Sequence, residues 1–379
     1  MNKRIMISAG EASGDMHAAN FVKALHTIDN SIEVYGMGSE QLRDAGVDLL
    51  IDCSDIAVVG LVEVIANYRK IIKALNILKE SLRNNPPDLL ILVDYQEFNS
   101  KLAVVAKSLG IKVLFYIGPQ VWAWRQHRVH KIGERIDMMA VILPFEEKFY
   151  ADANVPVRFV GNPLVDEAKP NRDKQSCLDD YQLSNDRPIV GLFPGSRRGE
   201  IKRVLPIQLE AAEKLLEQKP DLQFVLPVAS TLTKEAFADC LKKYSHLNVK
   251  LVKDLSYNVM QCCDAIITAS GTATLEIALM GVPNCNTYKM SPISYAILKR
   301  MVKIDKIGLV NIVAEKKIVE EFIQHQAQPQ LIADEIFKIL SDDLYRNNMT
   351  TELNKVRDKL GKTGGAKNVA QLALEMLNS

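Results

Sequence analysis

Short, almost purely apolar runs alternate with longer stretches of helical period along this chain, and no other feature constrains its fold so strongly. The run Leu89–Val93 is apolar throughout, which is typical of a strand buried on both faces of a sheet. Helical stretches between such strands predict strand-helix-strand units, and hence parallel sheets. The sequence therefore predicts an α/β fold of doubly wound, Rossmann-like domains. In the first half the predicted strands are Arg4–Ala9, Ile32–Tyr35, Leu89–Val93, Val113–Tyr116, Met138–Ile142 and Val157–Val160, with helices near Asp15–Thr27, Val59–Arg83, Ser100–Leu109 and Phe145–Ala151.

The same alternation restarts in the second half of the chain. Because 379 residues exceed what one hydrophobic core usually serves, two domains are expected. A polar stretch, residues 166–188, separates the two patterns and predicts a linker. We therefore predict a first domain at 1–165, a second at 189–345, and C-terminal helices at 346–379. The strands predicted for the second domain are Ile189–Phe193, Gln223–Pro227, Val249–Val252, Ala265–Ala269 and Pro283–Asn286.

The composition argues against several classes of protein. A formal net charge of +1 does not suit a large basic surface, so nucleic acid is not an expected partner. The six cysteines form no C-x-x-C pair and no zinc spacing, which predicts reduced thiols in the cytoplasm and no metal site. The first apolar run is too short for the core of a signal peptide. No apolar run approaches the roughly 18 residues that span a bilayer, so any membrane contact is expected to be peripheral.

Loops that follow the strands are the expected ligand sites, because open parallel sheets bind ligands beyond the carboxyl ends of their strands. The first such loop, Ala9–Asp15, is rich in glycine, which allows another molecule to approach the backbone closely. It matches neither the dinucleotide fingerprint nor the Walker motif. A purely structural turn is the alternative. The carboxylate of Glu11 and the hydroxyl of Ser13 favour a binding site.

An acidic residue, Asp94, follows the apolar strand Leu89–Val93 directly. A carboxylate at the end of a buried strand is costly unless it is paired or lies at the mouth of the sheet. At the mouth it is placed to accept a proton from a substrate hydroxyl. Asp94 is therefore the leading candidate for a catalytic base. A helix cap or a loop salt bridge is the structural alternative.

Both tryptophans of the chain lie in the segment Ile117–Arg128, which opens a basic stretch. Aromatic faces such as that of Trp124 suit a sugar or an acyl chain, and Arg125 is suited to a phosphate. We interpret Trp124 and Arg125 as acceptor or phosphate candidates. A solvated basic helix face is the more common explanation of such a pattern.

Two loops of the second half have the features of phosphate-binding turns. Phe193–Glu200 and Ala269–Glu276 each join a strand to a helix through small residues. Backbone N–H groups at such a turn, the helix N-terminus and Arg197 predict a diphosphate site. Glu276 lies about one turn into its helix, where a carboxylate can accept hydrogen bonds from a ribose diol. The donor-site candidates in these loops are Gly195, Ser196, Arg197, Ser270, Gly271, Thr272 and Glu276.

Together the loops predict a nucleotide held by the second domain, with an acid/base group supplied across a cleft by the first. This organisation is typical of a two-domain sugar transferase. A UDP-sugar epimerase of the same architecture is one alternative. A non-catalytic nucleotide-sensing module is another, although the acidic candidates Asp94 and Glu11 argue against it.

Several strings of residues resemble those of bacterial lipid-A-disaccharide synthases over essentially the whole chain. The resemblance implies the two-domain GT-B architecture, with no required metal or cofactor. It implies inverting transfer from UDP-2,3-diacylglucosamine to 2,3-diacylglucosamine 1-phosphate, at the inner face of the bacterial inner membrane, by a homodimer that exchanges its C-terminal helices. The strings are AGEASGD at Ala9–Asp15, VWAWRQHRVHKIG at Val121–Gly133, LPFE at Leu143–Glu146, PGSR at Pro194–Arg197 and ASGTATLE at Ala269–Glu276.

The same resemblance implies roles for individual residues. Asp94 corresponds to the probable base and Arg197 to the arginine that contacts the diphosphate. Glu11 corresponds to the glutamate of the N-terminal loop, and Asn311 lies in the region that closes the nucleotide pocket. The residues after Asp94 depart from the family, since Tyr-Gln-Glu replaces the Ala-Pro-Asp often seen there. Glu97 therefore stays a competing base.

The stretch Val59–Arg83 predicts an amphipathic helix with a basic border. Packing against a core is the default explanation of such an apolar stripe. Because a diacylated substrate resides in a bilayer, we also hypothesise that this helix docks on anionic membrane. The residues proposed for the membrane face are Val62, Ile65, Tyr68 and Ile72.

Overall fold

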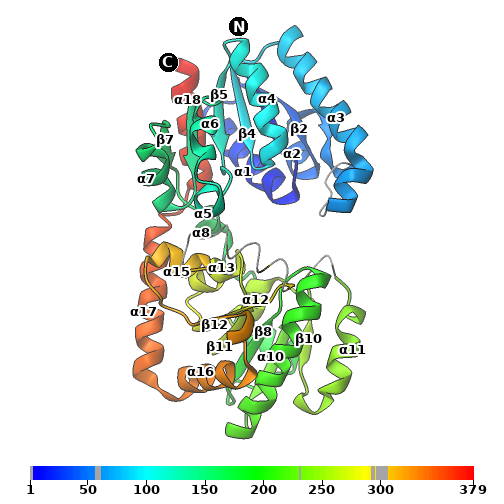
Figure 1. The fold of residues 1–379 in the computed structure, drawn as a ribbon, viewed down its shortest axis with the longest axis vertical. Coiled ribbons are helices and arrows are strands. Elements are labelled where there is room, and N and C mark those ends of the chain that lie inside the picture. The colour runs from blue at the N-terminus through cyan, green and yellow to red at the C-terminus, as the bar shows by residue number, and fades with distance from the viewer. Residues whose placement is uncertain (1–2, 56–60, 230–231, 292–294, 296–305) are drawn as a thin grey trace. The chain divides into compact units, whose positions relative to one another are not determined.

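A computed structural model describes residues 3–55, 61–229, 232–291, 295 and 306–379, and the side chains of residues 55 and 61–67 are outside that description. The chain divides into two compact units. Unit 1 comprises residues 1–163 and 361–379, and unit 2 comprises residues 164–360. Each unit is an α/β fold with one parallel sheet, as the alternating pattern predicts (Figure 1).

Unit 1 contains a seven-stranded parallel sheet in the order β3-β2-β1-β4-β5-β6-β7. Its strands are β1 (Arg4–Ala9), β2 (Glu33–Gly38), β3 (Asp48–Asp52), β4 (Leu89–Val93), β5 (Lys112–Tyr116), β6 (Met138–Val141) and β7 (Val157–Phe159). Its helices are α1 (Ala12–Ile28), α2 (Glu40–Asp44), α3 (Leu61–Asn84), α4 (Gln96–Ser108), α5 (Val121–Trp124), α6 (Arg128–Gly133), α7 (Pro144–Asp152) and α18 (Gly365–Asn378).

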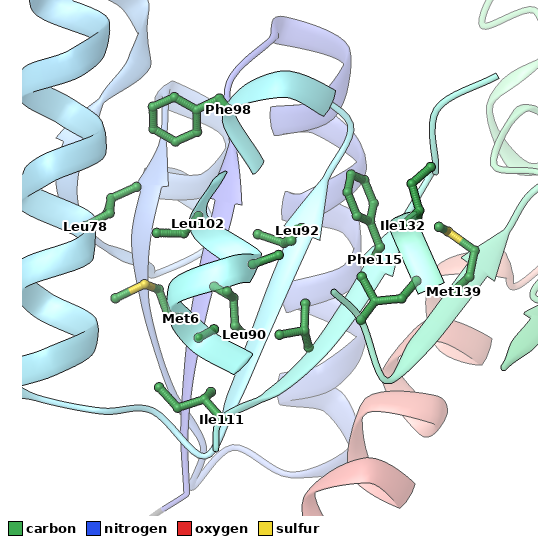
Figure 2. Packing of buried hydrophobic residues seen from close by; sticks show 14 of the residues in the cluster. Met6, Leu78, Leu90, Leu92, Phe98, Leu102, Ile111, Phe115, Ile132 and Met139 are labelled. Atoms are coloured by element: carbon green, nitrogen blue, oxygen red, sulfur yellow. The ribbon is translucent and has the colours of Figure 1, made fainter. Parts of the chain in front are cut away.

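Alternate side chains of β1 and β4 enter two separate cores, one on each face of the sheet. Met6, Leu90 and Leu92 pack with residues of α3 and α4, as Figure 2 shows. Ile7 and Ile91 point the other way and pack with residues of α1 and α18. This period of two explains why β4 is apolar at every position. Each fully buried Leu or Ile contributes about 1.5–3 kcal/mol relative to an exposed one.

Unit 2 contains a six-stranded parallel sheet in the order β10-β9-β8-β11-β12-β13. Its strands are β8 (Ile189–Phe193), β9 (Gln223–Pro227), β10 (Lys250–Val252), β11 (Ala265–Ala269), β12 (Asn284–Tyr288) and β13 (Glu321–Ile323). Its helices are α8 (Leu164–Glu167), α9 (Lys174–Tyr181), α10 (Arg198–Gln218), α11 (Glu235–Lys243), α12 (Ser256–Met260), α13 (Ala273–Leu279), α15 (Leu309–Ala314), α16 (Pro329–Ser341) and α17 (Asp343–Lys359).

The sequence analysis missed one edge strand of each sheet, β3 in unit 1 and β13 in unit 2. Asp48–Asp52 is half polar and only partly buried because β3 has one neighbour, so its apolar signal is weak. β13 has only three residues and forms the edge beside β12. The other predicted strands agree with the observed ones to within three residues at either end.

The segment predicted as a linker belongs to unit 2. It includes α9, and Arg172 and Tyr181 both bind the carboxylate of Asp254, with heavy-atom distances of 2.9 and 2.6 Å. The C-terminal helices divide between the units. α17 is part of unit 2, whereas α18 packs on α1 of unit 1. The Lys112 ammonium also donates to the backbone carbonyl of Met376 at 2.9 Å.

From Leu61 onward the amphipathic stretch lies in α3, and the second half of that helix faces the core. Leu75 and Leu78 are buried, whereas Tyr68 has 57% of its surface exposed and Ile72 is half-buried. The side chains of Val62 and Ile65 lie outside the described residues. Among the helices that the structure describes, none is long and apolar enough to cross a membrane.

Candidate active site

Each sheet has a switch point, the place where the chain's connections change direction. In unit 1 the switch point lies between β1 and β4, and in unit 2 it lies between β8 and β11. Four of the predicted site loops follow these four strands. Because ligands of open parallel sheets bind at such points, the fold concentrates the candidates in one place in each unit.

At the switch point of unit 1 the loop after β1 packs against the turn after β4. A Cβ atom added to Gly10 would lie 2.2 Å from the ring of Tyr95, so only glycine fits beneath that ring. A Cβ on Gly14 would lie 3.8 Å from the Cβ of Asp94. Gly10 therefore allows the N-terminal loop to pack against Tyr95, whereas the position of Gly14 beside Asp94 would accept a Cβ atom.

The turn after β4 has an unusual backbone. Asp94 and Tyr95 both have left-handed conformations, with φ of 48° and 46°. Ile117, which follows the neighbouring strand β5, is also left-handed, with φ of 60°. Non-glycine residues rarely adopt this conformation, and strained positions cluster at functional sites.

The two acidic candidates on this turn have different surroundings. Asp94 is partly buried, and burial raises the pKa of its carboxyl group, although a hydrogen bond from the Tyr95 backbone and the charge of His17 act in the opposite direction. The side chain of Glu97 is 74% exposed and forms an ion pair of 2.8 Å with Arg128. Burial thus raises the pKa of Asp94 above the ordinary aspartate value, whereas Glu97 lies in solvent.

The N-terminal loop divides into exposed and structural residues. Glu11 and Ser13 are exposed at the start of α1, and the negative charge of Glu11 adds to burial in raising the pKa of Tyr95. Asp15 is buried, and its carboxylate accepts hydrogen bonds from the backbone N–H and the hydroxyl of Ser39, both at 2.6 Å. Glu11 and Ser13 therefore lie on the exposed surface of this loop, while Asp15 fixes the loop after β2.

The two tryptophans have separate positions. Trp122 is buried, and its indole N–H donates to Glu146 at 3.0 Å. Burial raises the pKa of Glu146 to about 7, although the hydrogen bonds that its carboxylate accepts act to lower it. Trp124 is 40% exposed, and the Arg125 guanidinium lies 4.1 Å from the centre of its ring. Trp124 and the partly exposed Arg125 thus pair an aromatic face with a cation.

Unit 2 contains a pocket of about 450 Å³ at its switch point. Both phosphate-type loops line it, together with Tyr288 and with Ser256 and Met260 of α12, which the sequence did not indicate. The loops' glycines are both left-handed, with φ of 105° at Gly195 and 153° at Gly271. All seven donor-site candidates of these loops lie in the lining: Gly195, Ser196, Arg197, Ser270, Gly271, Thr272 and Glu276.

Arg197 occupies the N-cap position of the long helix α10. Its side chain is 70% exposed, and its guanidinium lies 3.8 Å from the carboxylate of Glu200. A Cβ on Gly195 would lie 2.5 Å from an oxygen of the same carboxylate, and its φ of 105° is one that residues with side chains rarely adopt, so glycine is favoured there. A helix N-terminus with a neighbouring arginine attracts anions, and the geometry suits a diphosphate.

Glu276 and Tyr257 form a hydrogen-bonded pair on the pocket's other side. The Tyr257 hydroxyl donates to the Glu276 carboxylate at 3.0 Å. Burial raises the pKa of Glu276, and burial together with the nearby carboxylate raises that of Tyr257. The bond holds one carboxylate oxygen of Glu276 in place while the residue lines the pocket.

Asn311 has a supporting position in unit 2. It is fully buried and does not line the described pocket. Its amide nitrogen donates to Val319 O at 2.9 Å and to Glu321 Oε1 at 2.7 Å, and its amide oxygen accepts from the backbone N–H of Ile318 and Val319. Both ends of this amide are therefore occupied by protein groups, and Asn311 joins α15 to residues 318–321.

These two switch-point sites occur in a chain whose sequence matches a known family. The family model described as lipid-A-disaccharide synthetase matches residues 5–376. The chain belongs to the lipid-A-disaccharide synthase family. A lipid-A-disaccharide synthase of Geobacter metallireducens is 50% identical over 376 residues, which cover 99% of this chain and 98% of that protein. Membership makes the chain a glycosyltransferase.

Solved structures similar to this member of the synthase family confirm the fold. A UDP-GlcNAc 2-epimerase from Neisseria meningitidis, solved with UDP-GlcNAc bound, matches with a TM-score of 0.64 over 99% of both chains at 12% identity. The calicheamicin glycosyltransferase CalG4 matches with a TM-score of 0.60, covering 100% of this chain and 98% of that one, at 14% identity. At these identities the likeness shows the two-domain GT-B fold alone. The epimerase alternative therefore has structural neighbours but no support from the family.

Sequence reasoning missed two buried amides at the switch points of this synthase-family chain. Asn99 of α4 hydrogen-bonds the ends of β1 and β4, and Gln208 of α10 hydrogen-bonds Phe193 of β8 and Ile267 of β11. Both side chains are fully buried. An amide within a predicted helix gives no sequence signal of such a role. Among the described residues, no group of three or more His, Cys, Asp or Glu side chains is arranged to hold a metal ion.

Proposed function

We propose that the chain transfers a diacylated glucosamine from UDP-2,3-diacylglucosamine to 2,3-diacylglucosamine 1-phosphate, giving the β-1,6-linked lipid A disaccharide 1-phosphate and UDP. The observation that carries the proposal is the pocket of unit 2, which both phosphate-type loops line, in a chain of the lipid-A-disaccharide synthase family. Its volume of about 450 Å³ lies in the usual range for a small-molecule site.

Unit 2 binds the UDP part of the donor in this proposal. Arg197 and the backbone N–H groups at the start of α10 contact the diphosphate, and Gly271 and its neighbours form the second phosphate-type turn. Glu276 accepts hydrogen bonds from the ribose diol. Asn311 supports the pocket from outside its lining. As the bond to the sugar breaks, negative charge develops on the leaving UDP, and Arg197 offsets it.

Unit 1 supplies the base. The 6-hydroxyl of the acceptor attacks C1 of the donor sugar, the bond from C1 to the UDP oxygen breaks, and Asp94 takes the hydroxyl proton. Two observations favour Asp94 over Glu97: burial raises its pKa toward the working range of a general base, and Glu97 is paired with Arg128 in solvent. One displacement of this kind inverts the configuration at C1.

The acceptor contacts unit 1 beside Asp94 in this proposal. Arg125, stacked on Trp124, is suited to the acceptor's 1-phosphate or to its sugar face, and Ser13 lies on the exposed N-terminal loop. Glu11, on the same loop, takes part in positioning the acceptor near Asp94.

Contact with the inner face of the inner membrane and formation of a homodimer complete the proposal. Exposed Tyr68, with Arg69 and Lys70 beside it on α3, supports docking on anionic lipid. Replacing Tyr68 and Ile72 with serine is expected to reduce co-sedimentation with vesicles that contain anionic lipid, with wild-type protein and neutral vesicles as references. Unchanged co-sedimentation would remove the membrane part of the proposal. Sedimentation equilibrium tests the dimer.

The decisive experiment is a chromatographic assay for disaccharide formation from the two acylated substrates. The expected result is a product that requires both, with stoichiometric release of UDP. An epimerase instead alters the UDP-sugar without any acceptor, and a sensing module binds UDP without turnover. Failure to form disaccharide with several acyl-chain lengths would overturn the assignment.

A further inference from the structure

The amide of Asn99 joins the two strand ends that carry the acidic site of unit 1. Asn99 has no exposed surface. Its Nδ2 donates to the carbonyl oxygens of Asp94 at 2.7 Å, Val93 at 3.2 Å and Ser8 at 3.3 Å. Its Oδ1 accepts the hydroxyl hydrogen of Ser8 at 2.7 Å. One side chain on α4 thus binds both β1 and β4 at the switch point.

These bonds fall on the strained part of the backbone. The paired register of β4 with β1 and with β5 ends at Val93, so the carbonyl of Asp94 lies beyond the sheet. Asp94 and Tyr95 are both left-handed there. A buried carbonyl needs a hydrogen-bond donor, and the Asn99 amide provides one at the residue where the chain leaves the sheet.

We propose that Asn99 is a positioning residue that holds the left-handed turn at Asp94 and Tyr95, and so fixes the direction and the burial of the Asp94 carboxylate. This inference rests on the proposed function, in which Asp94 is the base. Through Ser8 the same amide ties the turn to the end of β1, which leads into the loop containing Glu11. Asn99 contacts the backbone of Asp94 and acts only through it.

A purely structural role makes a different prediction. If Asn99 only stabilises unit 1, its loss lowers the fraction of folded molecules and leaves each folded molecule unchanged. If Asn99 positions Asp94, its loss changes the base itself. The turn relaxes, the carboxylate becomes better hydrated, and its raised pKa falls, because burial is the main cause of the shift.

The test compares Asn99→Ala with wild type in the disaccharide assay over a range of pH. We expect kcat to fall about 100-fold, the cost of a base displaced by about 1 Å. We also expect the acid limb of the kcat/KM profile to move to lower pH, with the KM for the UDP-sugar unchanged. Asn258→Ala is the matched control, because Asn258 is an equally buried amide that binds Asn171 and Asp254 in unit 2. Its acid limb is expected to coincide with that of wild type.

The folded fraction of unit 1 is measured separately. Both tryptophans of the chain lie in unit 1, so their emission reports the folding of that unit alone. If kcat per folded molecule and the acid limb both equal those of wild type, the positioning role is overturned. Should Asn99→Ala fail to fold, Ser8→Ala removes only the hydroxyl that orients the amide. It is expected to shift the acid limb in the same direction by a smaller amount, and an unmoved limb would also overturn the role.

The Asp94→Asn variant separates this inference from the function on which it rests. If Asp94→Asn keeps wild-type turnover, the base assignment fails whatever Asn99 does. If Asp94→Asn loses turnover, Asn99→Ala is expected to add little in the double variant, since both changes act on the same group. If Asn99→Ala lowers turnover by its full factor in the double variant as well, the assignment of Asp94 as the base stands and the positioning role of Asn99 is overturned.

Discussion

The candidate sites of both units lie at the switch points of their parallel sheets, but the residues with left-handed backbone differ between the two sites. In the pocket lining of unit 2 the left-handed residues are glycines, Gly195 and Gly271, one in each phosphate-type loop. At the turn after β4 in unit 1 the left-handed residues are Asp94 and Tyr95, which have side chains. Glycine at such a point exposes backbone to an anion, whereas a non-glycine residue presents a functional group. This contrast agrees with the proposal that unit 2 binds the nucleotide and unit 1 supplies the base.

The sharpest test of this division is Asp94→Asn. Removing a general base is expected to lower kcat by about 10²–10⁴-fold. The affinity for UDP, measured by calorimetry, is expected to stay unchanged because the binding loops belong to unit 2. Weakened UDP binding with intact turnover would contradict the division of roles between the two units.

The same substitution has an expected effect on stability. The pKa of Asp94 is raised in the folded state, so its contribution to stability is greatest below the ordinary aspartate range and is lost as pH rises through the folded-state value. At neutral pH the neutral amide of Asn should therefore make unit 1 more stable. Thermal unfolding followed by tryptophan emission is expected to give a higher midpoint, by about 2–4 °C for a gain of about 1 kcal/mol.

Arg197→Ala tests the other half of the division. Loss of a charge-assisted hydrogen bond to the diphosphate is expected to weaken UDP binding by about 10–100-fold. Arg198→Ala is the matched control, because Arg198 is exposed beside it and does not line the described pocket. Equal effects of the two substitutions would indicate a general electrostatic attraction and no specific contact.

Tyr257→Phe is expected to have a smaller effect on the same pocket. It removes the hydroxyl that donates to Glu276 at 3.0 Å and leaves the ring in place. A neutral donor that orients a carboxylate contributes modestly, so UDP affinity is expected to fall about 3–10-fold. The loss should vanish for a 2′,3′-dideoxyribose analogue of UDP if Glu276 binds the diol. An equal loss with the analogue would argue for a role elsewhere.

The smallest expected effect is a spectroscopic change in unit 1. Glu146 accepts the indole N–H of Trp122, and burial raises the pKa of Glu146 to about 7. Protonation weakens this acceptor, so tryptophan emission is expected to titrate with a midpoint near pH 7 and to be insensitive to UDP. Glu146→Gln should abolish the transition, whereas Trp124→Phe should leave it. A transition that survives Glu146→Gln would have another origin.

The sequence predicted the parts of each site that depend on local pattern. Apolar runs located the central strands, and the small and charged residues after them located the loops around Asp94 and Arg197. Asn99, Gln208 and Glu146 could not be predicted, since their roles depend on which strands become neighbours, and that is a property of the topology. Asn311 was predicted in the region that closes the nucleotide pocket; the structure shows that it is fully buried and does not line the described pocket.

The division of the C-terminal helices bears on the order in which the chain folds. Unit 2 is one continuous segment, residues 164–360, whereas unit 1 needs both residues 1–163 and α18, which covers one face of its sheet. A chain made from its N-terminus therefore completes unit 2 before unit 1 receives its last helix. Until then Phe21, Leu25 and their neighbours lack the apolar cover that Val369 and Leu372 provide. During synthesis, the unit that contains Asp94 is therefore finished after unit 2.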